Sequence, residues 1–384
     1  MSTLESIMAA AAAPLEEAYS LPFQAYTDKA VFAAECSKIF AKEWVFVCMA
    51  GELPDAGDYF AMTLAGEPIV VLRGEDGGLR ALSNICRHRG TVLLDDGFGK
   101  VDKYITCPYH AWAYDCEGAL QAIPFNKLIA VDRGAHQLTK LRVSTWHGMV
   151  FVNLDANAAP LHERLAGIDE FLHLFQPETF DQASSGGTEV WQTNWKLAME
   201  NAMESYHLFK VHESTLEVFS PTRDAYYVAG SSEWSLTGGA TQRQKGLVEK
   251  LMGSGYSELY DHYLLVQLAP SFVGVLSYGS FGWLSAHPID VHKTQIRSGA
   301  TFAGQNAVRS NDEFTQAFFA EDKAMCERVQ RGMQAQQSKG GKLVDMERVV
   351  VDFHQFLSSR LVGAATSAYF EDEWAERWRG AEMG

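Results

Sequence analysis

The sequence lacks any long apolar run. No stretch of about 18 or more uncharged apolar residues occurs among its 384 positions, so a membrane-spanning helix is not expected. The alanine-rich N-terminal stretch has no cationic start and is flanked by glutamates, which argues against a signal peptide. We therefore expect a cytoplasmic protein.

Cysteine and basic residues are also scarce, and each shortage excludes a class of protein. Six cysteines in a chain of this length do not make a disulfide framework, and we expect Cys36, Cys48, Cys116 and Cys326 to be free thiols. Because 48 acidic residues outnumber 32 basic ones, the net charge is -16, which argues against non-specific nucleic-acid binding. The hydrophobic content of 47% is ample for sizeable cores.

The spacing of apolar residues predicts an all-β unit between helical segments. From about residue 44 to residue 155, short runs such as "WVFVCMA", "YFAMTL", "PIVVLR", "LRALSN", "KYITCP" and "MVFVNL" are typical of strands, and "GEDGG" at 74–78 predicts a hairpin connection. Helical spacing occurs at 28–44 and 161–175. Residues 176–384 mix helical segments with expected strands at 262–270, 274–290 and 293–303. This pattern predicts an α+β chain without internal repeats.

Two short motifs bring together residues that bind metals. Cys86 and His88 form a Cys-x-His pair, and Cys107 and His110 form a Cys-x-x-His pair 18 residues later. A structural zinc site is one interpretation, but its usual first spacing has two to four intervening residues. The other is a [2Fe-2S] cluster of the Rieske type, in which two His replace two Cys on one iron and raise the reduction potential.

A second group of metal-binding residue types lies in "NWKLAMENAMESYHLFKVH", at 194–212. On a regular helix, His207 and His212 would diverge by about 140°, so both can bind one ion only if the helix is interrupted or carries a wide turn. Surface histidines on an amphipathic helix are the simpler interpretation of this pattern alone. Two His and one carboxylate on one face of an iron are typical of non-haem Fe(II) oxygenases.

A candidate for that carboxylate lies on a predicted helix beginning near Ser310, Asn311 and Asp312. Asp322 is the only charged residue at the spacing of the expected apolar stripe, which comprises Phe314, Phe318, Met325 and Val329. A carboxylate on a buried stripe is costly unless it is paired or binds a metal, and a salt bridge is the alternative. We expect Glu321, about 100° round the helix, to reach water.

The motifs "CRHRG" and "CPYHAW", and the string "NWKxxxENxxExYHxxxxH", resemble those of Rieske non-haem iron oxygenases, the α subunits of aromatic-ring-hydroxylating dioxygenases. The resemblance covers about residues 40–332, and it includes carnitine- and betaine-type monooxygenases. It implies a [2Fe-2S] cluster on Cys86, His88, Cys107 and His110, and a mononuclear non-haem Fe(II) on His207, His212 and Asp322. One departure is Ala111, where the family usually has glycine and where a methyl group should be tolerable.

The resemblance also implies a fold and an assembly. The expected domains are an N-terminal helical segment at 1–41 that packs on the catalytic domain, an all-β Rieske domain at 42–157, and a helix-grip (START-like) catalytic domain at 158–384. Three identical subunits would form a ring in which His88 or His110 of one copy bonds Glu204 of the next. Glu204 would then contact His207, while Asn201 and Trp195 would line or brace the pocket.

The implied reaction takes electrons from an NAD(P)H-dependent reductase, directly or through a ferredoxin, and uses O2 to oxidise a small molecule. A basic patch of Arg87, Arg89, Lys100 and Lys103 could receive such a partner, or could merely offset the charge of the cluster. The leading expectation is hydroxylation of an aromatic substrate. The alternative is cleavage or N-demethylation of a quaternary amine such as a betaine or carnitine, because aromatic walls suit both classes. A pure Rieske electron carrier and a zinc-stabilised binding protein are weaker interpretations.

Overall fold

The computed structural model describes residues 3–9, 11, 13–241, 257–304, 312–366 and 369–381. The chain divides into two compact units, which we describe separately. The β unit is Phe40–Ala158, and the mixed unit joins Met1–Ile39 to Ala159–Gly384. Among the described residues, no helix combines the length and apolar character that crossing a membrane requires.

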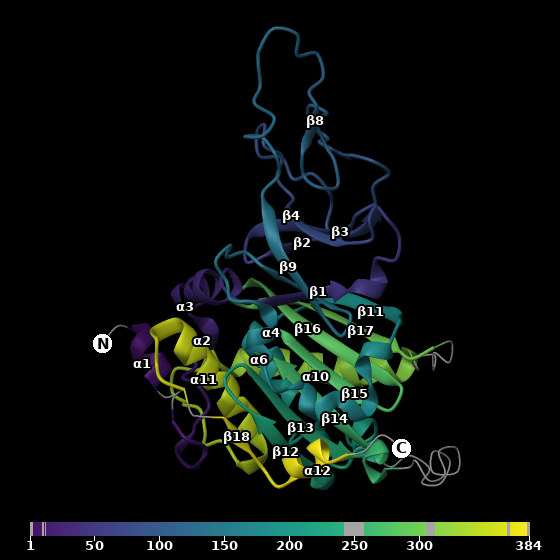
Figure 1. Ribbon diagram of the computed structural model, residues 1–384. Coiled ribbons are helices and arrows are strands. Elements are labelled where there is room, and N and C mark those ends of the chain that lie inside the picture. Colours follow the sequence, from purple (N-terminus) through teal and green to yellow (C-terminus); the bar gives the residue numbers. More distant parts are fainter. Residues whose placement is uncertain are drawn as a thin grey trace. The chain divides into compact units, whose positions relative to one another are not determined.

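The β unit contains a seven-stranded antiparallel sheet in the order β1-β10-β9-β4-β3-β2-β5, and a small sheet of β6, β7 and β8 (Figure 1). Its strands are β1 (Val45–Met49), β2 (Asp58–Leu64), β3 (Glu67–Arg73), β4 (Leu79–Ser83), β5 (Gly97–Lys100), β6 (Ile105–Thr106), β7 (Ala113–Tyr114), β8 (Leu120–Ala122), β9 (Lys140–Trp146) and β10 (Met149–Asn153). Strands β1 and β10 are buried along their whole length, which explains their unbroken apolar sequences.

One core connects the two sheets of the β unit. Val70, Leu72 and Leu82 of the large sheet belong to the same buried cluster as Ile105, Tyr114 and Leu120 of the small one, with Cys86 and Cys107 among them. The expected hairpin at 74–78 joins β3 to β4. The expected strand "KYITCP" is only two residues long because a loop begins at Cys107, and the sequence prediction missed β5 and β9.

The mixed unit is built on an eight-stranded sheet in the order β11-β17-β16-β15-β14-β13-β12-β18, counted over the described residues. The strands are β11 (Gln182–Trp191), β12 (Ala225–Gly230), β13 (Trp234–Ala240), β14 (His262–Leu268), β15 (Phe272–Ser277), β16 (Ser280–Asp290), β17 (Lys293–Phe302) and β18 (Phe370–Glu371). The helices are α1 (Thr3–Ala9), α2 (Gln24–Thr27), α3 (Lys29–Glu35), α4 (Leu161–Arg164), α5 (Asp169–Leu172), α6 (Trp195–Met203), α7 (Leu208–Val211), α8 (Leu216–Phe219), α10 (Asp312–Gly332), α11 (Arg348–Val362) and α12 (Trp374–Arg379).

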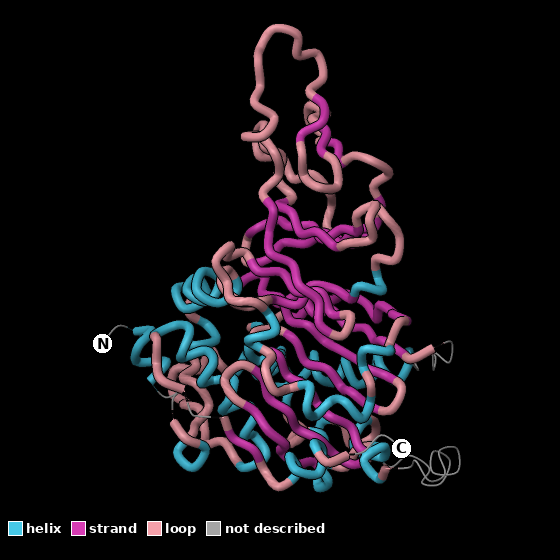
Figure 2. The backbone as a smooth tube through the Cα atoms, in the orientation of Figure 1, coloured by secondary structure: helices cyan, strands magenta, loops and turns pink. Residues whose placement is uncertain are grey.

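Helix α6 lies against strands β14 to β17, and α10 and α11 pack beside it (Figure 1). Figure 2 shows these helices in cyan along the magenta strands of the mixed unit. The side chain of Asn194 caps α6 by accepting a hydrogen bond from the backbone N–H of Lys196, and Gly363 ends α11 in the left-handed conformation. Helix α6, which precedes the candidate ligands His207 and His212, therefore has a capped start.

Several expected elements are shorter than the sequence pattern indicates. The segment 28–44 forms α3 and then a π-helix at Cys36–Phe40, and 161–175 breaks into α4, α5 and a 3-10 turn. Left-handed Gly167 lies between α4 and α5, and left-handed Gly279 turns the expected strand 274–290 into the β15–β16 hairpin. Ser310 and Asn311, the proposed cap residues, lie outside the described residues.

The expected apolar stripe of α10 is partly wrong. Val329 is 37% exposed, whereas Cys326 and Gln330 are buried. The buried side of the helix therefore includes a polar residue. Gln330 is tolerated there because its Oε1 accepts a hydrogen bond from the backbone N–H of Asn194 at 2.6 Å.

Candidate metal centres

Each of the two motif loops of the β unit presents a buried cysteine and a more accessible histidine. Cys86 and Cys107 are 3% and 2% exposed. The rings of His88 and His110 lie 4.8 Å apart, and His88 stacks on Trp112 at 4.7 Å. The fold therefore brings the four predicted ligands together, two thiols on the inner side and two imidazoles on the outer side.

The surroundings of these ligands fit a [2Fe-2S] cluster. The hydroxyl of Tyr114 lies 3.3 Å from Cys86 Sγ, and it accepts a hydrogen bond from the backbone N–H of Arg87. Burial raises the pKa of Cys107, but backbone hydrogen bonds at His110 and Tyr109 outweigh this effect and lower the pKa below its usual value. Donors near the sulfurs favour thiolates and tune cluster potentials.

An unsatisfied ring nitrogen supports the same fit. Nδ1 of His110 is buried and has no hydrogen-bond partner among the described residues. A buried polar atom without a partner calls for an explanation, and ligation of an iron supplies one. The four residues are thus suitable for a cluster held by two thiolates and two neutral imidazoles.

Ala111, where the family usually has glycine, adopts a left-handed conformation with φ of 55°. We expect Ala111→Gly to stabilise the β unit by about 1 kcal/mol, because this conformation costs other residues ~1–2 kcal/mol while glycine entropy offsets about 0.4–1 kcal/mol. Urea denaturation followed through the absorbance of the cluster measures the change. As a control, Ala113→Gly in strand β7 should be destabilising. Equal or lower stability of Ala111→Gly would show that the methyl group carries no strain.

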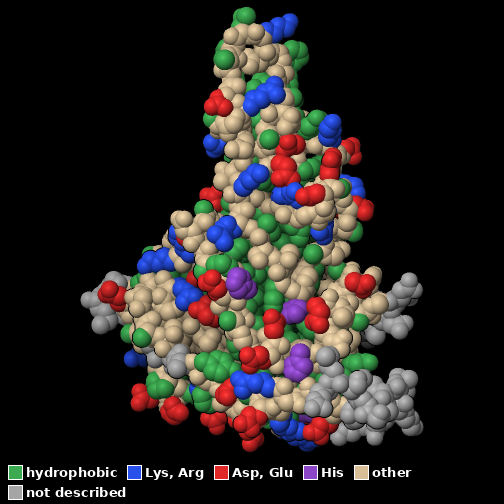
Figure 3. Space-filling view, in the orientation of Figure 1, with side chains coloured by type: hydrophobic (Ala, Val, Ile, Leu, Met, Phe, Trp, Pro, Cys, Tyr) green, Lys and Arg blue, Asp and Glu red, His purple; other side chains and the backbone are tan. Residues whose placement is uncertain are grey.

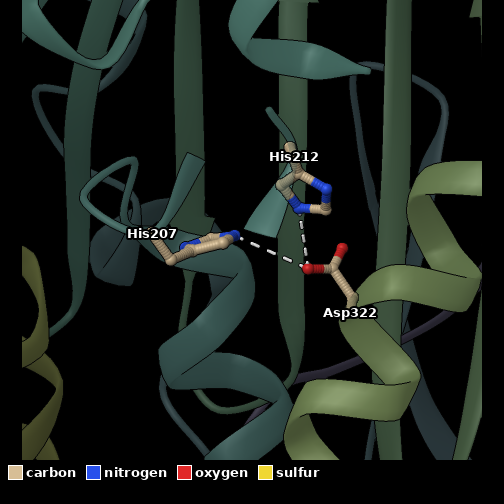
Figure 4. A group of neighbouring side chains, drawn as sticks. All are labelled: His207, His212 and Asp322. Atoms are coloured by element: carbon tan, nitrogen blue, oxygen red, sulfur yellow. Dashed lines mark hydrogen bonds and ion pairs between the residues drawn. The ribbon is translucent and has the colours of Figure 1, made fainter. Parts of the chain in front are cut away.

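In the mixed unit, His207, His212 and Asp322 form a compact group. Each offers one ligand atom, and these atoms lie within 4.8 Å of one another. Oδ1 of Asp322 is 2.9 Å from Nε2 of His212 and 3.5 Å from Nε2 of His207. Figure 4 shows the three side chains pointing toward a common centre, with Asp322 reaching it from helix α10.

The two histidines lie at the two ends of a single short helix. Helix α6 ends at Met203, Glu204 is extended with φ of -119° and ψ of 160°, and α7 begins only at Leu208. The two histidines flank α7, and their ring centroids are 5.1 Å apart. Glu204 precedes both histidines, so this break separates α6 from α7. His207 and His212 are the N-cap and C-cap of the four-residue α7, so the spacing of a longer regular helix does not fix the directions of their rings.

A carboxylate contacts Nδ1 of each imidazole, the nitrogen that faces away from Asp322. His207 Nδ1 lies 2.6 Å from Glu204 Oε1, and His212 Nδ1 lies 2.7 Å from Glu321 Oε2. Burial would lower the pKa of His207, but hydrogen bonds to Asp322 and Glu204 outweigh it and raise this pKa to about 9. The pKa of His212 is raised in the same way by Asp322 and Glu321. Such an excess of negative charge suits a divalent cation.

Glu321 can reach water, as expected, but the sequence analysis missed its contact with His212. Its side chain is 30% exposed, and its carboxylate bonds both His212 and Thr215. Helical spacing placed Glu321 away from the expected stripe, but the ring of His212 lies between Glu321 and Asp322. No pattern in the sequence indicates this, because His212 is 109 positions from Glu321.

Asn201 lies beside the predicted ligands. Its Nδ2 is 3.1 Å from Nε2 of His207, and its Oδ1 accepts a hydrogen bond from the thiol of Cys326 at 3.0 Å. This contact fixes the amide next to the position that a metal would occupy. Trp195 is fully buried, and its indole N–H donates to Glu35, so it braces α6 and does not line a pocket.

A buried polar network ties the N-terminal segment to α6. Lys196 and Glu35 are both 0% exposed and form an ion pair of 2.5 Å. One turn further along α6, Glu200 accepts hydrogen bonds from Tyr26 at 2.8 Å and from His354 at 3.0 Å. The sequence analysis did not identify this network, since its members come from four separate segments.

The predicted basic patch is weaker than its composition indicates. Lys100 pairs with Asp55 and Asp58, at 3.2 and 3.1 Å, so its charge is largely offset. Arg89 lies over the ring of Tyr109 at 5.2 Å. The exposed Arg87, Arg89 and Lys103 remain as candidates for a docking surface.

The two units correspond to two known sequence families. Residues 43–133 match the Rieske [2Fe-2S] domain, and residues 177–363 match the ring hydroxylating alpha subunit (catalytic domain). One chain therefore contains a domain for each inferred cofactor. The Rieske domain corresponds to the [2Fe-2S] cluster, and the catalytic domain contains His207, His212 and Asp322 as the candidate mononuclear iron site.

Similar proteins give the same picture. The carnitine monooxygenase oxygenase subunit of Escherichia coli (strain K12) is 36% identical over 223 residues, 58% of this chain and 59% of that protein, so the match spans less than two thirds of its length. The corresponding subunit of Acinetobacter baumannii is 28% identical over 380 residues, 92% of this chain and 96% of that protein. A crystal structure of a quaternary ammonium Rieske monooxygenase with γ-butyrobetaine has a TM-score of 0.76 at 26% identity, covering 93% of this chain and 98% of that one. The chain therefore belongs to the Rieske non-haem iron oxygenase α-subunit family.

Proposed function

We propose that the chain is the terminal oxygenase component of a Rieske monooxygenase that oxidises a quaternary or methylated amine. The observation that carries the proposal is the pairing, in one chain, of a Cys2His2 cluster site with a group of two His and one carboxylate. Bound there, the [2Fe-2S] cluster supplies single electrons and the mononuclear iron activates O2. The protein groups supply placement and hold the ligands in their binding forms.

Each residue has a defined task in this proposal. Cys86, His88, Cys107 and His110 hold the cluster, and His207, His212 and Asp322 hold the mononuclear iron. Glu204 keeps the Nδ1 proton of His207 in a hydrogen bond, so that Nε2 faces the metal position. The amide of Asn201 lies beside that position and can contact substrate or O2.

The domain limits and the assembly are part of the same proposal. We assign 1–41 to an N-terminal segment, 42–157 to the Rieske domain and 158–384 to a helix-grip catalytic domain, which the packing of α11 beside β12 and β13 supports. A ring of three copies would place His88 or His110 of one copy beside Glu204 of the next. A solved structure of a related quaternary ammonium monooxygenase carries the description of inter-subunit electron transfer. An NAD(P)H-dependent reductase, directly or through a ferredoxin, would supply the electrons.

Charge and the relatives favour an amine over an aromatic substrate, which reverses our leading expectation. The relatives above are named for carnitine, a quaternary ammonium compound. The mixed unit contains 34 acidic and 21 basic residues, against 14 and 11 in the β unit. Burial raises the pKa of Glu347, and nearby Glu204 and Glu200 raise it further, which places three acidic side chains near the candidate iron site. Figure 3 shows acidic side chains beside histidines on the face drawn. Such a field attracts a cation.

In the proposed reaction, one atom of O2 enters a C–H bond next to the substrate nitrogen and the other leaves as water, with two electrons and two protons consumed. The resulting carbinol releases an aldehyde and leaves the amine with one substituent fewer. We expect a red-brown protein with about three irons per chain, two in the cluster and one in the mononuclear site. A colourless protein containing zinc would overturn the proposal.

The substrate class is tested in a single turnover that needs no reductase. Dithionite-reduced protein, freed of excess reductant, is mixed with O2 and one of two panels, and products are measured by mass spectrometry. We expect product from the panel of carnitine, γ-butyrobetaine and glycine betaine. Product only from the panel of benzoate, anthranilate and naphthalene would show that the aromatic alternative is correct.

A further inference from the structure

We propose that Glu321, supported by Thr215, is a positioning residue that presents His212 to the metal through Nε2. This inference rests on the proposed function, because it assumes that His212 is a ligand. It concerns a carboxylate that lies next to the ligand Asp322 in sequence and has a separate task.

The geometry of Glu321 is specific to this role. Oε2 of Glu321 lies 2.7 Å from Nδ1 of His212 and accepts a hydrogen bond of 2.7 Å from the hydroxyl of Thr215. On the opposite side of the ring, Oδ1 of Asp322 lies 2.9 Å from Nε2. Two consecutive residues of α10 therefore hold both nitrogens of one imidazole.

A neutral imidazole has one N–H and one lone pair, so fixing the proton on one nitrogen frees the other for a metal. With its proton on Nδ1 facing Glu321, His212 must offer Nε2 toward Asp322 and His207. The ring of His212 is fully buried, so Glu321 and not water provides this hydrogen bond in the folded chain. Loss of the carboxylate would leave both tautomers accessible, and only one of them binds.

Thr215 holds Glu321 in place. Thr215 is 8% exposed, and its backbone N–H donates a hydrogen bond to the carbonyl of His212 at 3.0 Å. The turn after His212 thus places the hydroxyl of Thr215 beside the carboxylate of Glu321, which also contacts His212. Thr215 therefore bonds both the backbone of the proposed ligand His212 and the carboxylate of Glu321, which positions the ring of His212.

The arrangement parallels the other histidine. Glu204 bonds Nδ1 of His207 and is also held by the backbone N–H of His207 at 3.2 Å. Both iron-ligand histidines therefore have a carboxylate on Nδ1, one held by backbone and one by a threonine hydroxyl. Partners of this kind orient the ligand and raise its basicity, and their loss typically lowers metal affinity about 10–100-fold.

The test measures metal binding without catalysis. The mononuclear site is stripped, the cluster is kept oxidised so that it is silent in EPR, and Co(II) is titrated while its EPR signal is recorded. We expect Glu321→Ala to weaken Co(II) binding roughly 10–100-fold and to change its g values, since His212 is no longer held in one tautomer. Glu321→Gln keeps an oxygen acceptor for Nδ1–H, so it should restore the wild-type g values with an intermediate affinity.

Two further variants test the role of Thr215 and the effect of removing a negative charge elsewhere on α10. Thr215→Val leaves the carboxylate but removes its support, and should weaken binding less than Glu321→Ala does. Glu313→Gln removes one negative charge from an exposed position of α10, as Glu321→Ala does at its own position. It should leave the Co(II) affinity and the g values unchanged. Wild-type affinity and g values in Glu321→Ala would overturn the positioning role.

His212→Ala distinguishes failure of this inference from failure of the proposed function. If His212→Ala loses Co(II) binding while Glu321→Ala does not, the iron site stands and Glu321 has no role in it. If His212→Ala binds Co(II) like the wild type, the iron site itself is misassigned. Absorbance of the cluster and circular dichroism confirm that each variant is folded.

Discussion

Replacing His207 with alanine is expected to abolish product formation while leaving the spectrum of the Rieske cluster intact. The substitution removes one of the three proposed protein ligands, so the loss should exceed the roughly 10–100-fold that follows removal of an outer partner. The iron content should fall from about three to about two per chain. Single-turnover product yield, iron analysis and absorbance measure the three quantities on one preparation.

The cluster provides an internal control, because its four proposed ligands lie in the β unit and His207 lies in the mixed unit. His162→Ala, at an exposed position in helix α4 of the mixed unit, is the matched variant and should keep full yield and full iron. Continued turnover in His207→Ala would show that the catalytic iron is elsewhere. Loss of the cluster spectrum in that variant would show general misfolding and not loss of one ligand.

Replacing Lys196 with methionine is expected to destabilise the mixed unit by about 3–5 kcal/mol, because it leaves the buried carboxylate of Glu35 without its cation. Burial already raises the pKa of Glu35, and Lys196 opposes that effect. The indole N–H of Trp195, at 2.8 Å from Glu35, cannot replace a full charge. Denaturation followed by tryptophan fluorescence measures the loss, while cluster absorbance follows the β unit separately.

The double variant Glu35→Leu with Lys196→Met removes both charges, and it should recover most of the lost stability. Lys210→Met, which removes an exposed lysine in α7, should change stability by less than about 0.5 kcal/mol. If Lys196→Met is as stable as the wild type, the ion pair contributes nothing that a methionine cannot replace. If the double variant is as unstable as the single one, packing around Lys196 and not its charge is responsible.

The two predictions concern residues that the sequence revealed to different degrees. His207 stands in a recognisable string, and its chemistry could be inferred from neighbours within a few positions. Lys196 stands in the same string, but its partner Glu35 lies 161 positions away in the N-terminal segment. A linear pattern shows which residues occur together along the chain, and it does not show which distant side chain neutralises a buried charge.

The strand pattern of the β unit was largely predictable, since β1, β3 and β10 are apolar runs and buried strands have this composition. The glycine-containing β5 was not, because pairing with β2 and not propensity makes it a strand. In α10, the predicted stripe placed Val329 inside, whereas the fold buries Cys326 and Gln330. The sequence pattern misplaced the buried face of α10, because a hydrogen bond from the backbone N–H of Asn194 stabilises the buried Gln330.

By itself, the sequence determined the residue types of both candidate metal sites, the spacing of the proposed cluster ligands, and the need for an interrupted helix or a wide turn if His207 and His212 share one ion. These features are local, so a few consecutive residues contain them. Only the tertiary structure decided that His207 and His212 flank the short helix α7, that Asp322 reaches both imidazoles, and that the partly exposed Glu321 bonds His212. The reason is geometric: packing α10 beside α6 sets distances between residues more than 100 positions apart, and those distances determine which atoms can share one ion.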